Sequence, residues 1–290
     1  MASSLERDAM RCAISLSALG FGTTSPNPPV GCVIIGADGN VVGQGYHERK
    51  GEPHAETRAL AAAGRMAEGG TAVVTLEPCN HQGRTPPCRQ ALIDAKVARV
   101  VIAILDSTSR GEGGAAALSA AGIDVEVGLL ASEARLVLGP WLQALETHRP
   151  YVTWAYVPGA NESRTALIFR QQLREKSDAI LFEDGSVEEG VAHSHGEGIL
   201  HLVAKPLSSG PAAVLSALHD GGVRSLLLSG GRDLAEPFLQ QEVVDEIVLV
   251  VDGDEPAGVA SASWSFLPPG FRLVSVDKVL GVVVAIGRRR

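Results

Sequence analysis

Aromatic side chains, cysteines and long apolar runs are all scarce in this sequence. Phe, Trp and Tyr make up 4% of the 290 residues, so the core must be built from Ala, Val, Leu and Ile. Four cysteines are too few for a disulfide framework, and closely spaced cysteines in a reducing compartment indicate metal ligands or catalytic groups. No stretch is long and apolar enough to span a bilayer, and the N-terminus carries charges where a signal peptide has an apolar run. We therefore expect a cytoplasmic protein without a membrane partner.

Basic charge is also in short supply. The chain has 25 Lys and Arg against 33 Asp and Glu, a net charge of -8. This balance argues against a protein that binds nucleic acid by neutralising phosphates, although a small anionic substrate needs only one or two local cations. Hydrophobic residues make up 45% and charged residues 20%, which is typical of a globular chain. The length exceeds that of one typical domain, so we predict two.

The first half of the chain alternates helical and strand-like segments. Apolar residues at helical spacing predict helices, and short runs of β-branched residues predict strands. Helices are expected at 5–19, 55–66, 88–95 and 115–121, and strands at 30–35, 41–45, 71–76, 100–105 and 123–129. Strands separated by helices of this length indicate a three-layer α/β domain.

The second half has the same character and predicts another α/β domain. Strands are expected at 151–157, 179–182, 199–204, 225–228 and 247–251, with two more near the C-terminus, and helices at 169–176, 211–219 and 234–241. The boundary is expected between residues 145 and 150, which gives domains 1–147 and 148–290. A stretch rich in Gly, His and Glu, residues 183–198, interrupts the pattern. Its histidines His193 and His195, with His201 and Glu197, are typical of a solvated loop.

One histidine, one glutamate and two cysteines form the pattern that carries chemistry. His54 and Glu56 stand at the start of an expected helix, Cys79 follows a strand, and Cys88 opens the next helix. One imidazole and two thiolates suit tetrahedral zinc with the fourth position open, which is typical of a catalytic ion with a bound water. Glu56 is close enough to serve as a proton shuttle without being a ligand.

The spacing makes this pattern more specific than its parts. His-x-Glu followed by Pro-Cys and a second cysteine is the signature of zinc-dependent nucleobase deaminases, although eight residues separate Cys79 from Cys88 here instead of two. A structural zinc site would need a fourth protein ligand, and the sequence offers no obvious candidate. A chance grouping of core residues is the other alternative.

Several segments resemble the bifunctional riboflavin-biosynthesis deaminase–reductase family. PNPPVG at residues 26–31 is similar to the family's PNPxVG, and His47 precedes His54 by seven residues as in its G-x-H-x(6)-H-A-E pattern. TLEPCNHQGRTPPC at residues 75–88 matches T-L-E-P-C-x-H-x-G-[KR]-T-P-P-C almost throughout. The resemblance is strong over about residues 5–150.

This resemblance implies a fold, a reaction and a set of site residues. It implies a cytidine-deaminase-like three-layer domain followed by a smaller dihydrofolate-reductase-like domain, in a homodimer or homotetramer. It implies hydrolytic removal of the 2-amino group from 2,5-diamino-6-ribosylamino-4(3H)-pyrimidinone 5′-phosphate. By position, zinc would be bound by His54, Cys79 and Cys88, with Glu56 as proton shuttle. The residues that would contact the substrate are Asn27, His47, His81, Arg84 and Asp106.

The chain departs from the family after the strand expected at 100–105. The family has Asp-Pro-Asn there, and this chain has Asp106 followed by Ser107 and Thr108. The loss of the family's asparagine concerns the choice of substrate and leaves the zinc chemistry unchanged. A paralogue that deaminates a related pyrimidine in a specialised pathway is therefore an alternative.

The second domain resembles the family's reductase less closely. Ala155 stands where the family has a lysine, and its aspartate motif is not recognisable at residues 159–164. Glu183 and Asp184 would repel the phosphate of a nicotinamide nucleotide. LLLSGGRDLAEPF at residues 226–238 still resembles the family's glycine-rich stretch, so Gly230 and Gly231 are candidate contacts for a pyrophosphate at a helix N-terminus.

These observations favour a zinc-dependent deaminase whose second domain has lost reductase activity. NADPH would be a cofactor only if that domain were functional, in which case the protein would still be bifunctional. A non-catalytic protein that senses a flavin precursor is the alternative from another class. The intact zinc ligands and Glu56 argue against it.

Overall fold

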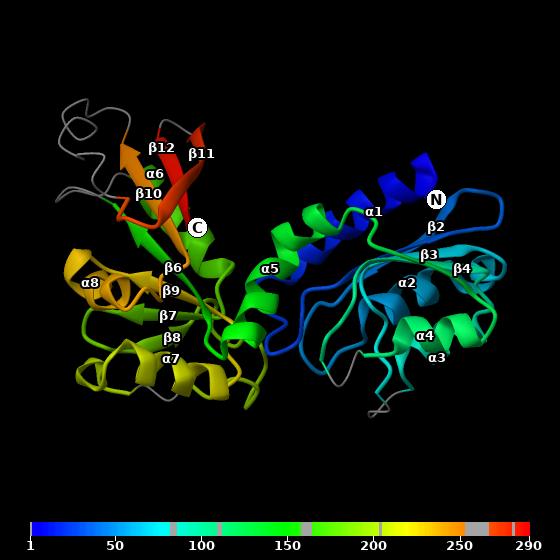
Figure 1. Cartoon of the computed structure of the whole chain (residues 1–290), viewed down its shortest axis with the longest axis horizontal. Coiled ribbons are helices and arrows are strands. Elements are labelled where there is room, and N and C mark those ends of the chain that lie inside the picture. The colour runs from blue at the N-terminus through cyan, green and yellow to red at the C-terminus, as the bar shows by residue number, and fades with distance from the viewer. Residues whose placement is uncertain are drawn as a thin grey trace. The chain divides into compact units, whose positions relative to one another are not determined.

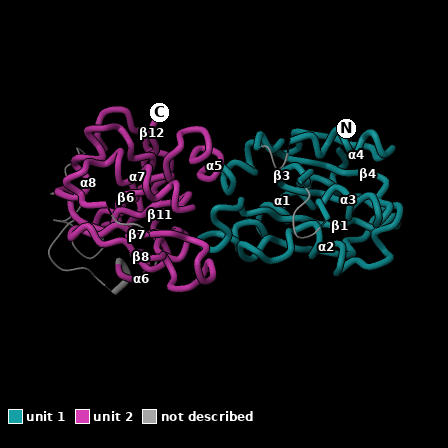
Figure 2. The backbone as a smooth tube through the Cα atoms, turned by 90° about the horizontal axis from the view of Figure 1, so that it is seen from below, with its two compact units in different colours: residues 1–139 teal, residues 140–290 magenta. Residues whose placement is uncertain are grey.

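The protein forms two compact units, residues 1–139 and 140–290 (Figure 2). The computed structural model describes residues 2–81, 86–108, 112–157, 164–202, 205–252, 267–279 and 282–290. The division falls inside helix α5 (Ala131–Thr147), whereas the sequence suggested a boundary after residue 147. By this division the second unit is the longer one.

Unit 1 is built on a five-stranded sheet with the order β2-β1-β3-β4-β5. Its strands are β1 (Gly31–Ile35), β2 (Val41–Tyr46), β3 (Thr71–Leu76), β4 (Arg99–Ile104) and β5 (Asp124–Val127). β1 is antiparallel to both of its neighbours, while β3, β4 and β5 are parallel. The carboxyl ends of β3 and β4 therefore lie side by side, the position where open α/β sheets bind ligands.

Helices cover both faces of this sheet, as Figure 1 shows. α1 (Ser4–Ser17) lies on one face, and α2 (Ala55–Ala63), α3 (Cys88–Asp94) and α4 (Gly114–Ala120) lie on the other. α2 approaches β2 so closely that a Cβ atom at Gly43 would stand 2.2 Å from the Ala59 carbonyl oxygen. Glycine is therefore required there, and this contact holds the middle of α2 near the sheet.

Unit 2 contains a seven-stranded sheet with the order β11-β12-β10-β6-β9-β7-β8. Its strands are β6 (Tyr151–Tyr156), β7 (Ala179–Phe182), β8 (Val187–Glu189), β9 (Ser225–Ser229), β10 (Glu246–Asp252), β11 (Phe271–Val279) and β12 (Val282–Arg289). The four central strands are parallel, and the outer pairs are antiparallel.

Alternate side chains of these strands supply two separate cores. α7 (Pro211–Asp220) and α8 (Arg232–Gln240) pack on the face that carries Val152, Leu181 and Leu228. On the other face, Phe169 and Leu173 of α6 (Arg164–Glu175) pack against the remaining strand residues. Those residues include Val248, Val250, Ile180 and Leu227. Both units are thus three-layer α/β structures, which confirms the predicted fold class.

Asp245 holds β6, the first strand of unit 2, in place by hydrogen bonds. Its carboxylate, 3% exposed, accepts two hydrogen bonds from the Arg149 guanidinium at 2.6 and 2.7 Å, one from Gln143 and one from the backbone of Val152. All four are directed to one buried charge, so its desolvation is compensated by a paired cation and by two neutral donors, one side-chain and one backbone.

Most predicted elements are present with shifted ends, but two expectations were wrong and one helix was not predicted. Residues 199–202 form no strand, and His201 instead donates its backbone N–H to Gly221. The histidine-rich stretch is not simply a solvated loop, because His195 is 0% exposed and bonded to Asp178 at 3.2 Å. Helix α5 was missed, since Pro140 in its middle is typical of a helix break. None of the described helices is long and apolar enough to cross a membrane.

Candidate active site

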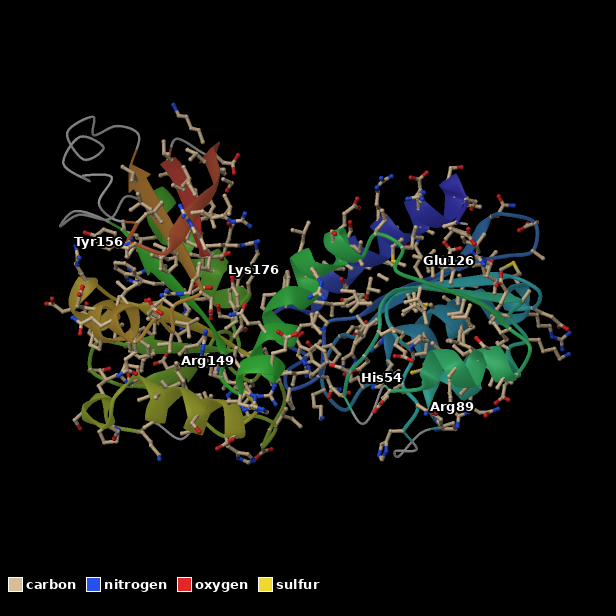
Figure 3. All side chains as sticks on the ribbon, viewed as in Figure 1. His54, Arg89, Glu126, Arg149, Tyr156 and Lys176 are labelled. Carbon is tan, nitrogen blue, oxygen red and sulfur yellow. The ribbon has the colours of Figure 1, made fainter. Side chains whose placement is uncertain are left out.

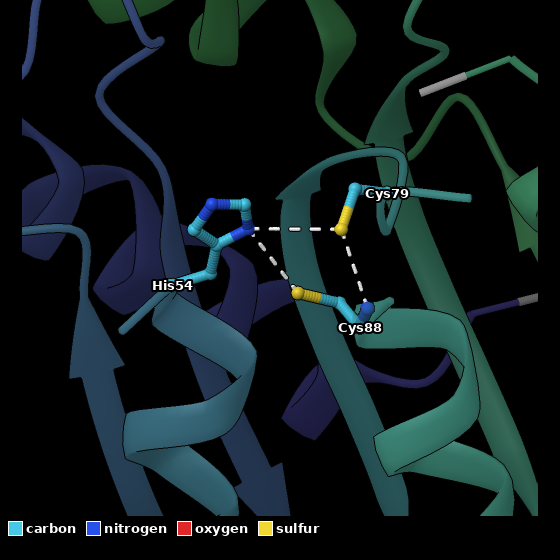
Figure 4. A group of neighbouring side chains, drawn as sticks. All are labelled: His54, Cys79 and Cys88. Atoms are coloured by element: carbon cyan, nitrogen blue, oxygen red, sulfur yellow. Dashed lines mark hydrogen bonds between the residues drawn. The ribbon is translucent and has the colours of Figure 1, made fainter. Parts of the chain in front are cut away.

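Three metal-ligating side chains converge in unit 1. His54 Nδ1 lies 3.7 Å from the Cys79 Sγ and 3.3 Å from the Cys88 Sγ (Figure 4). His54 caps the N-terminus of α2, Cys88 is the first residue of α3, and Cys79 lies just beyond the carboxyl end of β3. Two helix starts and one strand end therefore place together residues that are 34 positions apart in the chain.

The start of α3 prepares Cys79 for metal binding. The backbone N–H of Cys88 donates a hydrogen bond to the Cys79 Sγ at 3.2 Å. The side chain of Cys88, with His54 and this N–H, lowers the pKa of the Cys79 thiol to about 4. A thiolate at a helix N-terminus is a ready metal ligand, and metal binding displaces the proton that remains on such a pair.

The donor set fits zinc. A nitrogen about 2.0 Å and a sulfur about 2.3 Å from one ion at the tetrahedral angle lie about 3.5 Å apart, close to the nitrogen–sulfur distances of 3.7 and 3.3 Å seen here. All three ligand atoms lie within 4.8 Å of one another. Within the described part of the chain, no fourth His, Cys, Asp or Glu joins the group. Three protein ligands with a free position are typical of catalytic zinc.

Glu56 lies beside this group on the first turn of α2. Its side chain is 3% exposed, and burial raises the pKa of the carboxyl group, while His54 opposes that shift. A carboxyl group with a raised pKa exchanges a proton more readily near neutral pH than an exposed one. The geometry thus gives Glu56 the environment of a proton-transfer group.

A directed chain of hydrogen bonds crosses the other side of the site. Lys50 Nζ donates to Asn27 Oδ1 at 2.9 Å, and Asn27 Nδ2 lies 3.1 Å from His47 Nε2. An ammonium can only donate, so it fixes the orientation of the Asn27 amide, and Nε2 of His47 must accept. The proton of His47 is then on Nδ1, which donates to the Pro53 carbonyl at 3.3 Å.

Burial keeps His47 neutral, and the hydrogen bonds from Lys50 through Asn27 to His47 use only part of the Asn27 amide. Burial lowers the pKa of His47 to about 4, with a further contribution from His54, whose ring packs edge-on at 5.1 Å. Asn27 is half-buried, and among the described residues its side chain makes only these two hydrogen bonds, so one N–H and one lone pair of the amide remain. The amide therefore offers a donor beside an acceptor.

The other residues predicted to contact the substrate, His81, Arg84 and Asp106, differ in how the structure places them. His81 is exposed, and Arg84 lies outside the described residues. Asp106 is buried just beyond the carboxyl end of β4, where its Oδ1 accepts a hydrogen bond from the Thr108 backbone at 2.8 Å. Ser107 and Thr108 thus belong to a turn organised by the aspartate itself.

Glu77 stabilises the loop that carries Asp106 by hydrogen bonds. Its two carboxylate oxygens accept from the Asp106 backbone at 3.1 Å and from Ala115, in the first turn of α4, at 2.7 Å. Gly114 permits this approach, because a Cβ atom there would lie 2.0 Å from the Pro78 carbonyl oxygen. Neither Glu77 nor Lys50 was singled out from the sequence, where a glutamate in a motif and a loop lysine give no signal of these partners.

Unit 2 has its own pocket, with a volume of about 560 Å³, at the carboxyl ends of β6, β7 and β9. Tyr156, labelled in Figure 3, and Phe182 line it, together with Glu183 and the glycine pair that precedes α8. The backbone N–H of Gly231 already donates to Glu183 Oε1 at 2.6 Å. The sequence predicted repulsion of phosphate by this glutamate but not its direct bond to the glycine.

Comparison with known proteins agrees with this architecture. Residues 3–104 match the family model of the cytidine and deoxycytidylate deaminase zinc-binding region, and residues 149–252 match the RibD C-terminal domain. These matches support zinc as the cofactor of unit 1. They also confirm a cytidine-deaminase-like domain followed by a reductase-like one.

Two bacterial relatives carry the same name. The riboflavin biosynthesis protein RibD of Escherichia coli (strain K12) is 53% identical over 144 residues, which cover 49% of this chain but only 39% of that protein. The protein of the same name from Mycobacterium tuberculosis (strain ATCC 25618 / H37Rv) is 35% identical over 288 residues, 84% of each chain.

Two solved structures have the same fold over the whole chain. A diaminohydroxyphosphoribosylaminopyrimidine deaminase/5-amino-6-(5-phosphoribosylamino)uracil reductase from Thermotoga maritima superposes with a TM-score of 0.81 at 23% identity and 99% coverage of both chains. RibD from Acinetobacter baumannii (form 1) gives 0.78 at 28% identity, again with 99% coverage of both. With one relative 35% identical over 84% of both chains and both domains matched in order, this chain belongs to the riboflavin biosynthesis protein RibD family.

Proposed function

We propose that unit 1 catalyses the hydrolytic deamination step of riboflavin biosynthesis. The substrate is 2,5-diamino-6-ribosylamino-4(3H)-pyrimidinone 5′-phosphate, and its 2-amino group leaves as ammonia. The observation that supports this most directly is the convergence of His54, Cys79 and Cys88 beside the buried Glu56.

The residues divide the reaction between them. A zinc ion held by the histidine and the two cysteines supplies Lewis-acid activation of water near neutral pH. Glu56 takes one proton from the attacking water and passes it to the ring nitrogen, and then takes the proton of the added hydroxyl and passes it to the departing amine. Water adds its oxygen to the ring carbon, the carbon–nitrogen bond breaks, and ammonia is released, so the sum is hydrolysis without a redox cofactor.

The donor chain from Lys50 selects and orients the pyrimidinone. Asn27 presents an N–H and a carbonyl lone pair to the lactam edge, while neutral His47 holds the amide in place. Asp106, His81 and Arg84 are further proposed contacts, with Arg84 as a cation for the substrate phosphate. The substrate is a small pyrimidine nucleotide, and nothing in the charge balance favours a nucleic acid.

Ammonia release from the purified zinc-loaded protein tests the deaminase. We expect turnover of the diaminopyrimidinone phosphate, and a loss of about a thousandfold in Glu56→Gln with zinc content unchanged. Turnover that survives in Glu56→Gln contradicts the role of this residue. Turnover of a related pyrimidine only, with none of this substrate, would show that the exchanged Ser107 and Thr108 have altered specificity.

We further propose that unit 2 lacks the reductase activity of its relatives. Ala155 replaces the family's lysine on the pocket wall, and Glu183 and Asp184 add two carboxylates to it. NADPH oxidation, followed separately from ammonia release in the same sample, decides this. Ammonia without NADPH consumption is the expected result, and stoichiometric NADPH loss would mean that the protein is bifunctional.

The same reasoning extends to the cellular setting. We propose that the protein works as a homodimer or homotetramer in the cytoplasm, where the thiols of Cys79 and Cys88 stay reduced and able to bind zinc. Light scattering of the purified protein measures the assembly, and a monomer would contradict it.

A further inference from the structure

The pocket of unit 2 has the shape of a phosphate site but not its charge. It lies where parallel strands β6, β9 and β7 end and where α8 begins, a place at which α/β proteins bind phosphates on a helix N-terminus. Gly230 and Gly231 precede that helix and leave room beside the backbone. Trp154 fixes this segment, because its Nε1 donates to the Gly230 carbonyl at 3.1 Å.

The side chain of Glu183 fills the room that the two glycines leave. A Cβ atom at Gly230 would stand 2.6 Å from the Glu183 Cγ, and one at Gly231 would stand 3.3 Å from its Oε1. The same oxygen accepts the Gly231 N–H at 2.6 Å. The carboxylate thus has the position, the hydrogen bond and the sign of charge that a ligand phosphate would have.

We propose that Glu183 is an internal substitute for phosphate that excludes nicotinamide dinucleotides from this pocket. The inference rests on the proposed absence of reductase activity and names its cause. A dinucleotide would have to displace the carboxylate from Gly231 and then bring its own negative charges close to it. The residues present therefore do not fit NADPH, although the domain family implies it.

The other charged groups around the pocket leave the bond between Glu183 and Gly231 in place, although one of them is a cation. Asp184 adds a second carboxylate, which accepts from the Ser186 backbone and hydroxyl at 2.9 and 2.6 Å within its own turn. Arg170 also lines the pocket, and its guanidinium donates to the Ser229 hydroxyl at 2.8 Å. Of these two carboxylates, Glu183 is the one that accepts a hydrogen bond from the glycine pair, and Asp184 accepts only from its own turn.

That difference provides a matched pair of variants. NADPH is titrated at low ionic strength into the zinc-loaded wild-type protein and into Glu183→Ala, Glu183→Gln and Asp184→Asn, and the dissociation constant is measured by the fluorescence of the nucleotide. We expect Glu183→Ala to bind about tenfold more tightly than the wild type, the effect of one charge at a helix N-terminus. Glu183→Gln should gain less, since its amide oxygen can still accept from Gly231, and Asp184→Asn should change little.

Two results would overturn the proposal. One is equal affinity of the wild type and Glu183→Ala. The other is an equal gain in Asp184→Asn, which would assign the effect to total charge instead of the occupied N–H. Ammonia release should be unchanged in all variants, because Glu183 lies outside unit 1.

The experiment separates this inference from the proposed function. Stoichiometric NADPH oxidation by the wild type would contradict the loss of reductase activity. If the wild type oxidises no NADPH and Glu183→Ala gains no affinity, the loss of activity stands and only the role of Glu183 fails.

Discussion

The two units place their sites at the same point of the architecture and equip them differently. In unit 1 the ends of parallel strands and the starts of two helices hold three electron-pair donors, a set that is incomplete without a cation. In unit 2 the corresponding strand ends and helix start hold a carboxylate that already satisfies the backbone donor. The fold provides the location in both, and side chains decide whether a ligand is needed.

The largest effect on this difference between the units is expected when a metal ligand of unit 1 is removed. Cys88→Ser should reduce bound zinc from about one ion per chain to nearly none. Ammonia release should fall by at least about a thousandfold, because the metal lowers the activation free energy by several kcal/mol. Elemental analysis and the ammonia assay measure both. Cys12→Ser, at a half-buried cysteine of α1, is the control and should change neither. Activity in a zinc-free Cys88→Ser protein would refute a metal-dependent unit 1.

The next largest effect concerns the stability of unit 2. Asp245→Ala leaves Arg149 as a half-buried cation without its carboxylate partner and removes the acceptor of the Gln143 and Val152 hydrogen bonds. The local free energy of unfolding should fall by about 3–5 kcal/mol. Hydrogen exchange of peptides from β6 and β10 reports this. Asp220→Asn, at a side chain that is 79% exposed, should stay within about 0.5 kcal/mol, and equal protection in the two variants would contradict the assigned role.

Lys50 sharpens the account of substrate orientation in unit 1. Lys50→Met should raise KM about tenfold and leave kcat nearly unchanged, because a charge-assisted hydrogen bond to Asn27 is lost before the chemical step. Lys50→Arg should recover most of the loss. Arg49→Met, at the exposed neighbour, serves as the control. A fall in kcat at constant KM would show that Lys50 acts in the transition state instead.

The smallest expected effect is a pH dependence of unit 1. Burial alone would raise the pKa of Glu6, but hydrogen bonds from Ser3 and Arg99 lower it below the ordinary value of 4.5. A lowered pKa stabilises the folded state above that value, and the contribution disappears as the pH falls below it. At this partly exposed site we expect no more than about 1 kcal/mol. Glu6→Gln should therefore cost stability in urea at pH 7 and much less near pH 4.

The convergence of the candidate metal ligands was more predictable than the contacts around them. The structure brings His54, Cys79 and Cys88 together as the sequence suggested, because metal ligands need particular residue types at element ends, and both features are local. Their roles and that of Glu56 stay predictions. Lys50 was not found from the sequence, because its significance depends on which atom of Asn27 it reaches, and that follows only from folding. Arg84 and its neighbours lie outside the described residues, so their part in the site stays a prediction.

In unit 2 the limits are different. Strands β7 and β9 were expected almost at their observed bounds, since short runs of buried β-branched and leucine residues are strong signals. His195 was misassigned, because composition alone places a histidine among Gly, Ser and Glu in solvent. Its burial depends on Asp178, 17 residues earlier, which also accepts the backbone N–H groups of Arg224 and Ser225. Long-range polar pairing leaves no periodic trace in the sequence.

The bond between Glu183 and Gly231 also has a consequence for competition. A group tethered to the same chain acts at an effective concentration on the order of millimolar or more. A free anion at micromolar concentration therefore loses to Glu183 by mass action, even where its intrinsic affinity for the glycine backbone is equal. The side chain of Glu183 thus occupies the Gly231 N–H most of the time, and a nucleotide displaces it only at a concentration that approaches the effective concentration of the tethered carboxylate.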